Sequence, residues 1–323
     1  MYVVIIMKKH YKNFEIDSLN HPNVLLLGNG MLKLGNKGTS WNDLLSSIKT
    51  REGCVNVKSV PYAMQPEALC GVDVEDIQRR VAKNIETLDS VHPLLRELLN
   101  LPFDAVLTTN YTYEVEEVLS GKPFTSYARK KAYFALDGNT KVKHNTFVCN
   151  VVNTPDGRTI PVFHIHGEKE RKHSMILSYY SYAKSLSLLT NYNKDLGNRL
   201  FECQQENINH SCKCWLDYFL VGNVWSVGFR LDVSEFDIWW AIERKARENA
   251  HHGCFKAYFD GEEKDDSPQK ILLDAMDGNY RFFSVVDGDY ASMYKQVIDD
   301  IKADMLKDNL KTRIICDIEN KKG

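Results

Sequence analysis

Short, mainly apolar runs recur along the chain and predict the strands of a sheet. Six of them are three to six residues long: 24–27, 105–107, 161–165, 224–229, 255–259 and 281–286. Continuous apolar runs of this length are typical of strands that are buried on both faces. The run at 24–27 stands between Pro22 and Gly28, and the run at 224–229 is interrupted by Gly228.

Between these runs, apolar residues recur at three- and four-residue spacing, which predicts amphipathic helices. In the clearest example, Asp73 caps a helix whose apolar face carries Ile77, Val81 and Ile85. Similar patterns predict further helices at 41–49, 93–99, 113–119, 236–250, 271–276 and 290–305. Residues 168–222 are also expected to be largely helical, with a loose middle at 191–197.

Residues 124–160 are polar and rich in turn signals, of which Asp137-Gly138 and Pro155-Asp156-Gly157 are the clearest. Such signals favour tight connections between antiparallel strands. Elsewhere the alternation of strands and helices predicts an α/β fold with a doubly wound, mostly parallel sheet. We expect one domain over 1–305 with helical insertions at about 42–100 and 168–222, followed by a C-terminal tail over 306–323.

The composition agrees with the predicted fold and argues against several classes of protein. The 323-residue chain is 43% hydrophobic and 26% charged, which is ordinary for a folded protein. Its net charge of −2 argues against a general nucleic-acid binder, which depends on excess Lys and Arg. Eight scattered cysteines favour a reduced, cytoplasmic protein over a disulfide scaffold. The apolar segment 2–7 is too short to cross a bilayer and has no basic segment before it, so we expect neither a secretory signal nor a membrane protein.

Polar and glycine residues directly follow three of the predicted strands. These are Gly28-Asn29-Gly30, Thr108-Thr109-Asn110 and His166-Gly167. Open α/β sheets bind their ligands at the carboxyl ends of the strands, so one site at one edge is expected. The glycine loop could offer backbone N–H groups to a phosphate, or it could be a plain tight turn. The chain has no Gly-x-Gly-x-x-Gly loop, no Walker loop, no Gly-x-Ser-x-Gly and no His-Glu-x-x-His. These absences argue against the enzyme classes that such motifs mark.

His164 and His166 stand two apart in a predicted strand, so both are expected to point to one face. They could form a metal pair, or His166 could be a structural histidine; Gly167 after it would let a substrate approach closely. A second group of possible zinc ligands, with a set of ordinary thiols as the alternative, consists of Cys203, His210, Cys212 and Cys214. Its Cys-x-Cys spacing differs from the paired Cys-x-x-Cys units of common structural zinc sites.

Four motifs, in their order along the chain, resemble a known family. They are Leu27-Gly28-Asn29-Gly30, Thr108-Thr109-Asn110-Tyr111, His164-Ile165-His166-Gly167 and Val227-Gly228-Phe229. Together they resemble the sirtuin-like NAD-hydrolysing domains of bacterial anti-phage defence systems, and also the abortive-infection AbiH group, over residues 23–290. The resemblance implies a Rossmann-like sheet with a helical subdomain, and cleavage of NAD to nicotinamide and an ADP-ribose product.

The resemblance also implies roles for the residues of these motifs. His166 would be the general base, neutral at pH 7, and Asn110 would hold the nicotinamide ribose or the attacking water. NAD, as the substrate and without a metal, would be bound by Gly28, Asn29, Gly30, Thr109, Gly228, Phe229, Arg230 and Asp260. Gly28 and Gly30 would approach the pyrophosphate. Gly228 and Phe229 would line the adenosine ribose, and Asp260 would contact a ribose.

The chain departs from this family at three points. It lacks the two Cys-x-x-Cys units of deacylating sirtuins, which argues against a protein deacylase. Thr112 stands where the family often has Asp, and Arg230 stands where it has a ribose-contacting Ser; Arg230 could meet a phosphate instead. These two substitutions favour the alternative of a non-catalytic domain that senses NAD or ADP-ribose, or that serves as a scaffold in a defence complex.

The resemblance further implies an NAD-depleting effector of abortive infection. Because no sensor domain is recognisable in the chain, we expect regulation by homo-oligomerisation or by a separately encoded activator such as an ATPase. No direct contact with nucleic acid or a membrane is expected.

Overall fold

The computed structural model describes residues 21–35, 40–50, 57, 59–85, 87–88, 90–125, 128, 133–135, 144–205, 212, 214–247, 253–262, 264, 266–276 and 278–319. For 133–135, 194–205 and 308–319 only the backbone is described. The turn signal Asp137-Gly138 and the apolar segment 2–7 lie outside the described residues.

An eight-stranded sheet forms the centre of the molecule, in the order β3-β4-β5-β2-β1-β6-β7-β8. Its strands are β1 (Asn23–Leu27), β2 (Ala105–Thr108), β3 (Tyr133–Ala135), β4 (Val148–Asn153), β5 (Thr159–His164), β6 (Asn223–Val227), β7 (Phe255–Asp260) and β8 (Asn279–Phe283). At one edge, β4 pairs antiparallel with both β3 and β5, and all the pairs from β5 across to β8 are parallel. If the six parallel strands are numbered by their order along the chain, their order across the sheet is 3-2-1-4-5-6. This is the doubly wound, Rossmann-like arrangement. The predicted fold class is confirmed.

Strand β1 lies in the middle of the sheet and is covered on both faces. Leu25 and Leu27 belong to one hydrophobic core, and Val24 and Leu26 belong to the other. This follows from the alternation of side chains along a strand. Since β1 pairs in register with both β2 and β6, the three strands end at the same edge of the sheet.

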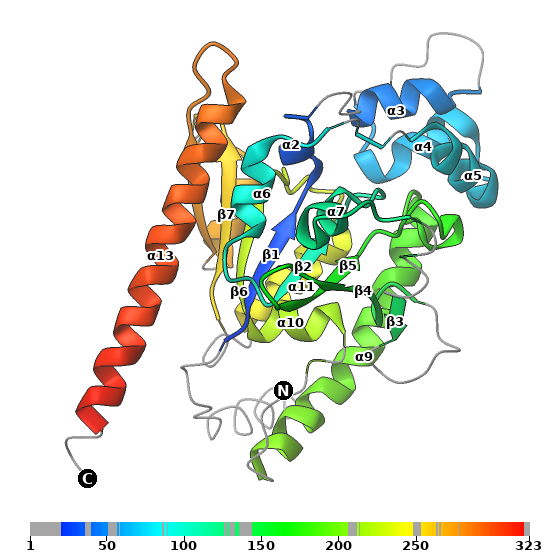
Figure 1. The fold of residues 1–323 in the computed structure, drawn as a ribbon. Coiled ribbons are helices and arrows are strands. Elements are labelled where there is room, and N and C mark those ends of the chain that lie inside the picture. Colours follow the sequence, from blue (N-terminus) through cyan, green and yellow to red (C-terminus); the bar gives the residue numbers. More distant parts are fainter. Residues whose placement is uncertain are drawn as a thin grey trace.

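Helices cover both faces of the sheet (Figure 1). On the face of Leu25 and Leu27 pack α6 (Pro93–Leu99), α7 (Glu114–Ser120) and α13 (Tyr290–Glu319). On the opposite face pack α10 (Trp215–Val221), α11 (Phe236–Arg247) and α12 (Pro268–Ala275). Helix α13 continues to Glu319, past the end at 305 that the pattern predicted, and its C-terminal half extends away from the sheet in Figure 1. None of the described helices has a stretch that is long and apolar enough to cross a membrane.

The helical subdomain lies beside the carboxyl ends of the strands. It contains α3 (Trp41–Ile48), the 3-10 turn η1 (Tyr62–Met64), α4 (Gln65–Cys70) and α5 (Val74–Asn84). Asp73 caps α5, as predicted, by accepting a hydrogen bond from the Asp76 N–H. The small core of the subdomain also includes Tyr111 and Leu177, which come from the sheet side. The subdomain is therefore anchored next to the loop that follows β2.

Helix α9 (Tyr179–Gln205) contradicts one expectation. It continues without a break through 191–197, where a loose segment was predicted from the asparagines and Gly197. A glycine inside a helix costs about 1 kcal/mol relative to alanine. Tertiary contacts offset such local costs: the Tyr192 hydroxyl donates to Asp217 Oδ2 at 3.0 Å, and the ring packs edge-on against Phe147.

The turn signal Pro155-Asp156-Gly157 does connect two antiparallel strands, β4 and β5, as predicted. Gly157 has a φ of +89°, and its N–H donates to the Thr154 carbonyl at 3.0 Å. Two short elements complete the described fold: α2 (Asn29–Leu32) follows β1, and the 3-10 turn η2 (Lys172–Ser174) precedes α9.

A buried lysine joins α11 to the end of α10. Lys245 Nζ donates to the carbonyl oxygens of Phe219, Leu220 and Gly222 at 3.1, 3.0 and 2.7 Å. The last carbonyl groups of a helix lack partners within the helix, so this ammonium group closes α10. Burial lowers the pKa of Lys245 to about 7.

Candidate active site

A cavity of about 470 Å³ lies where β1, β2 and β6 end. The loops after these strands form one wall, and Trp41, Leu44 and Tyr62 of the helical subdomain form another. Most of the predicted site residues line this cavity: Asn29, Gly30, Thr109, Asn110, His166, Gly228, Phe229 and Arg230. Gly28 and Asp260 are not among its described lining residues.

The cavity coincides with the point where the strand order reverses, between β1 and β6. Doubly wound sheets bind dinucleotides in the crevice at this point. The loops after β1 and β6 touch here: the Gly28 N–H donates to Val227 O at 2.9 Å, and the Gly30 N–H donates to Gly228 O at 2.8 Å. A Cβ atom on Gly28 would lie 2.4 Å from the Gly228 oxygen. The two glycines of the first loop thus allow the loops to pack closely, and their contact with a pyrophosphate stays a prediction.

Asn110 is held firmly at the cavity wall. Its backbone N–H and its Nδ2 both donate to Thr108 Oγ1, at 3.1 and 2.9 Å. Thr108 in turn donates to the Leu27 carbonyl at 3.0 Å, which ties the end of β2 to β1. Thr108 engages one of the two N–H groups of Nδ2, so the side-chain oxygen and the second N–H are the groups that Asn110 can offer to a ligand.

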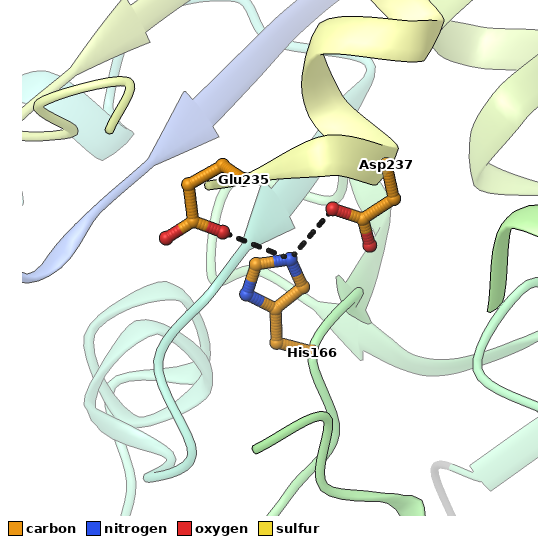
Figure 2. Close-up of side chains that lie close together, drawn as sticks. All are labelled: His166, Glu235 and Asp237. Carbon is orange, nitrogen blue, oxygen red and sulfur yellow. Dashed lines mark hydrogen bonds and ion pairs between the residues drawn. The ribbon is translucent and has the colours of Figure 1, made fainter. Parts of the chain in front are cut away.

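His166 lies two residues beyond β5 and faces two carboxylates at the start of α11 (Figure 2). Its Nε2 lies 3.3 Å from Asp237 Oδ1 and 3.6 Å from Glu235 Oε2. Tyr182 of α9 packs its ring edge against the imidazole and donates its hydroxyl to Glu235 Oε2 at 2.8 Å. Of the two acids, Glu235 lines the cavity, whereas Asp237 is 1% exposed and lies outside the described lining.

The two carboxylates decide the charge of His166. Burial alone would lower its pKa, but the charges of Asp237 and Glu235 and the hydrogen bond to Asp237 outweigh burial and raise the pKa to about 9. Burial raises the pKa of Glu235; the neighbouring His166 opposes this rise, and Asp237 adds to it. The raised pKa runs against the expectation of a neutral His166 at pH 7, because the two acids favour the protonated imidazole.

His164 does not share a site with His166, and the prediction that both rings point to one face is wrong. Strand β5 ends at His164, and the chain then turns, with the Gly167 N–H bonded to the His164 carbonyl at 2.9 Å and Gly167 at a φ of +96°. The His164 ring faces α7, with Nε2 2.8 Å from Glu116 Oε1 and Nδ1 2.7 Å from the Asn110 carbonyl oxygen. Strand alternation fails here because His166 lies outside the strand.

Among the described residues, one group of side chains could hold a metal ion: His166, Glu235 and Asp237, whose donor atoms lie within 4.8 Å of one another. A metal pair of His164 and His166, one of the two readings left open by the sequence, is excluded by the different directions of the two rings. Cys214 is buried at the start of α10. The side chain of Cys203 and the whole of His210 lie outside the described residues, so zinc or plain thiols remain the two alternatives there.

Arg230 is an exposed residue of the cavity and pairs with Asp260, which is not among the described lining residues. Arg230 lines the cavity with a side chain that is 78% exposed, and Nη2 lies 3.4 Å from Asp260 Oδ2. Leu231, the next residue, has a φ of +50°, which is strained for a residue with a Cβ. Thr112 also lines the cavity.

Sequence reasoning missed Glu235, Asp237 and Tyr182. The two acids stand about seventy positions from His166, so no local spacing joins them to it. A signal was nevertheless present: the two acids open a helix that follows the strand β6, and such helix starts lie at the same carboxyl edge as the predicted site.

Comparison of the chain with protein-family profiles and with curated protein sequences gave no match.

Proposed function

We propose that this protein is an NAD glycohydrolase, which cleaves NAD to nicotinamide and ADP-ribose. The observation that carries the proposal is the His166–Glu235–Asp237 cluster, which faces a cavity at the reversal point of a doubly wound sheet through His166 and Glu235. That position favours a dinucleotide, and a carboxylate that reaches the cavity, that of Glu235, suits the cleavage of a bond at a sugar carbon.

The charge of the cluster fits the transition state of this reaction. Breaking the nicotinamide–ribose bond builds positive charge on the sugar. One imidazolium with two carboxylates carries a net charge of −1. Of the two carboxylates, that of Glu235 lines the cavity and can face the positive charge on the sugar. Nicotinamide leaves as a neutral molecule, so no acid has to protonate it.

Water completes the reaction by adding its oxygen to the ribose carbon and losing one proton. Since His166 is already protonated, Glu235 is the acceptor of this proton, and its raised pKa suits that task. His166 holds the Glu235 carboxylate in place, and buried Asp237 holds His166. Asn110 positions the ribose or the water with its side-chain oxygen.

The resemblance of the four motifs supports a wider role as an NAD-depleting effector of bacterial anti-phage defence. In this role the protein is cytoplasmic, acts as a homo-oligomer and is switched on by a separately encoded partner such as an ATPase. NAD is its substrate, and no metal takes part.

A second candidate is a nucleotide-sensing or scaffold domain without turnover. Two observations favour it: Thr112 replaces the family's acid, and a protonated His166 cannot accept a proton. A protein deacylase ranks third, since the chain lacks the paired Cys-x-x-Cys units of deacylating sirtuins.

Nicotinamide release from NAD tests the proposal, with wild type, His166→Ala and Asn110→Ala compared in the presence of EDTA. We expect release by wild type and loss in both variants. Binding of NAD or ADP-ribose by wild type without release of nicotinamide, also in the oligomeric state and with cell extract as a source of activator, would instead establish the sensor.

A further inference from the structure

Glu114, the first residue of α7, places a carboxylate at the edge of the cavity. The residue is 3% exposed and lines the cavity together with Leu88 and Thr112. Its Oε1 accepts a hydrogen bond from the Leu88 N–H at 3.1 Å. Its Oε2 is buried and has no hydrogen-bond partner among the described residues.

A buried carboxylate oxygen without a partner destabilises the folded protein, so such groups are uncommon unless they serve a function. The cavity provides a place for the missing partner. The same cavity is also lined by the apolar side chains of Leu32, Ile85 and Trp41, against which the ring of a ligand can pack.

We infer that Glu114 is a ligand-binding residue whose Oε2 accepts a hydrogen bond from a hydroxyl or amide N–H group of the molecule that fills the cavity. An ionised carboxylate can only accept hydrogen bonds, so it selects donors and rejects phosphate. Because Oε2 is covered, the side chain rotates toward the cavity when the ligand binds. On the proposed function, on which this step rests, the donor is a ribose hydroxyl or the carboxamide of nicotinamide.

Glu116, on the same helix, provides a matched control. It is also buried and also has an unpartnered Oε2, but it is not among the described lining residues of the cavity. Its Oε1 is bonded by His164 and by Asn150, at 2.8 Å each. Glu116 is therefore a structural acid, against which the behaviour of Glu114 can be compared.

The test compares Glu114→Gln with Glu116→Gln. Glutamine keeps an oxygen for the Leu88 N–H and replaces Oε2 by a donor. We expect Glu114→Gln to lower the affinity for NAD at least tenfold in titration calorimetry and to leave the urea midpoint of the unliganded protein equal or higher. Glu116→Gln should lower that midpoint and leave the affinity unchanged. Separate titrations with ADP-ribose and with nicotinamide show which half of NAD carries the donor.

Two results would overturn the inference: unchanged affinity of Glu114→Gln for NAD and both halves, or a fall in its urea midpoint as large as that of Glu116→Gln. Binding that depends on Glu114 without any release of nicotinamide would contradict only the glycohydrolase. If wild type bound none of the three probes, the urea midpoint would decide: a higher midpoint for Glu114→Gln supports a ligand of other structure, and a lower one refutes the inference.

Discussion

His164 and His166 are both buried beside carboxylates, yet they act on different parts of the molecule. His166 faces Asp237 and Glu235 at the cavity, and His164 links Glu116 to the backbone of Asn110. Both ring nitrogens of His164 face acceptors, so both carry protons. Consistently, the charge of Glu116 outweighs burial and raises the pKa of His164 to about 9.

Replacement of Glu235 tests its place in the reaction. We expect Glu235→Gln to lower kcat for nicotinamide release by about 10²- to 10⁴-fold, the range typical of a lost proton acceptor, with little change in KM. Glu243→Gln, at a half-exposed position of the same helix outside the described cavity lining, is the control and should behave as wild type. Equal activity of both variants would assign the proton to another group.

The raised pKa values of the two histidines predict a loss of stability in mild alkali. A rise from 6.5 to about 9 corresponds to about 3 kcal/mol for each histidine. Because the pKa is higher in the folded state, this stabilisation is complete below pH 6.5 and is lost as the pH rises through 9. Urea unfolding at pH 6, 7.5 and 9 measures it.

Lys245 works in the opposite direction in part of this range. Its pKa is lowered to about 7, so the folded state gains stability as the pH rises above 7. The contribution of His166 is therefore taken from the difference between wild type and His166→Gln, which we expect to shrink from pH 6 to pH 9. A difference that is constant with pH would show that the imidazole is not protonated in the fold.

At the scale of elements, the crossing of the loops after β1 and β6 sets the shape of the cavity. The space between them admits no Cβ at Gly28, since the Gly228 oxygen and Phe229 Cα would lie 2.4 and 2.6 Å from it. Both atoms belong to the backbone or are fixed to it, so neither can move aside cheaply.

Gly28→Ala should therefore lower the free energy of unfolding by about 3 kcal/mol or more, as overpacking does in a dense interior. Gly71→Ala is the control: Gly71 has a φ of +92° and a ψ of −175°, with open space around it, so the substitution adds only backbone strain of about 1–3 kcal/mol. Urea unfolding of both variants checks the order. A smaller loss at position 28 than at position 71 would mean that the loops separate easily.

The elements that could be predicted from sequence are those with local signals. The buried strand β1 is a continuous apolar run, α5 has its Asp73 cap, and the turn between β4 and β5 has its Pro-Asp-Gly signal. The continuity of α9 could not be predicted, because it depends on contacts of Tyr192 with residues far along the chain. The same reason hid Glu235 and Asp237, whose proximity to His166 exists only in the folded sheet.

At the scale of the whole molecule, the cavity lies between the sheet and the helical subdomain, which share a core at Tyr111 and Leu177. A ligand in this cavity contacts both parts and stabilises the folded protein by mass action. We expect ADP-ribose at about one hundred times its Kd to raise the free energy of unfolding by about 2.7 kcal/mol. Thermal unfolding with and without ADP-ribose measures this, and Arg230→Ala, which removes one of the exposed cations that line the cavity, should reduce the shift.

Chemical labelling of Lys245 can detect the opening of the folded molecule. Its amine is 3% exposed and committed to three carbonyl oxygens, so an acylating reagent in solution cannot reach it while α10 and α11 are packed. Once exposed, an amine reacts rapidly. The labelling rate of Lys245 that mass spectrometry detects, divided by that of exposed Lys307, should therefore be small and should report the fraction of molecules that are open. Label on a single lysine then reports the opening of the fold under native conditions. Labelling of Lys245 as fast as that of Lys307 would show that the packing of these helices is transient.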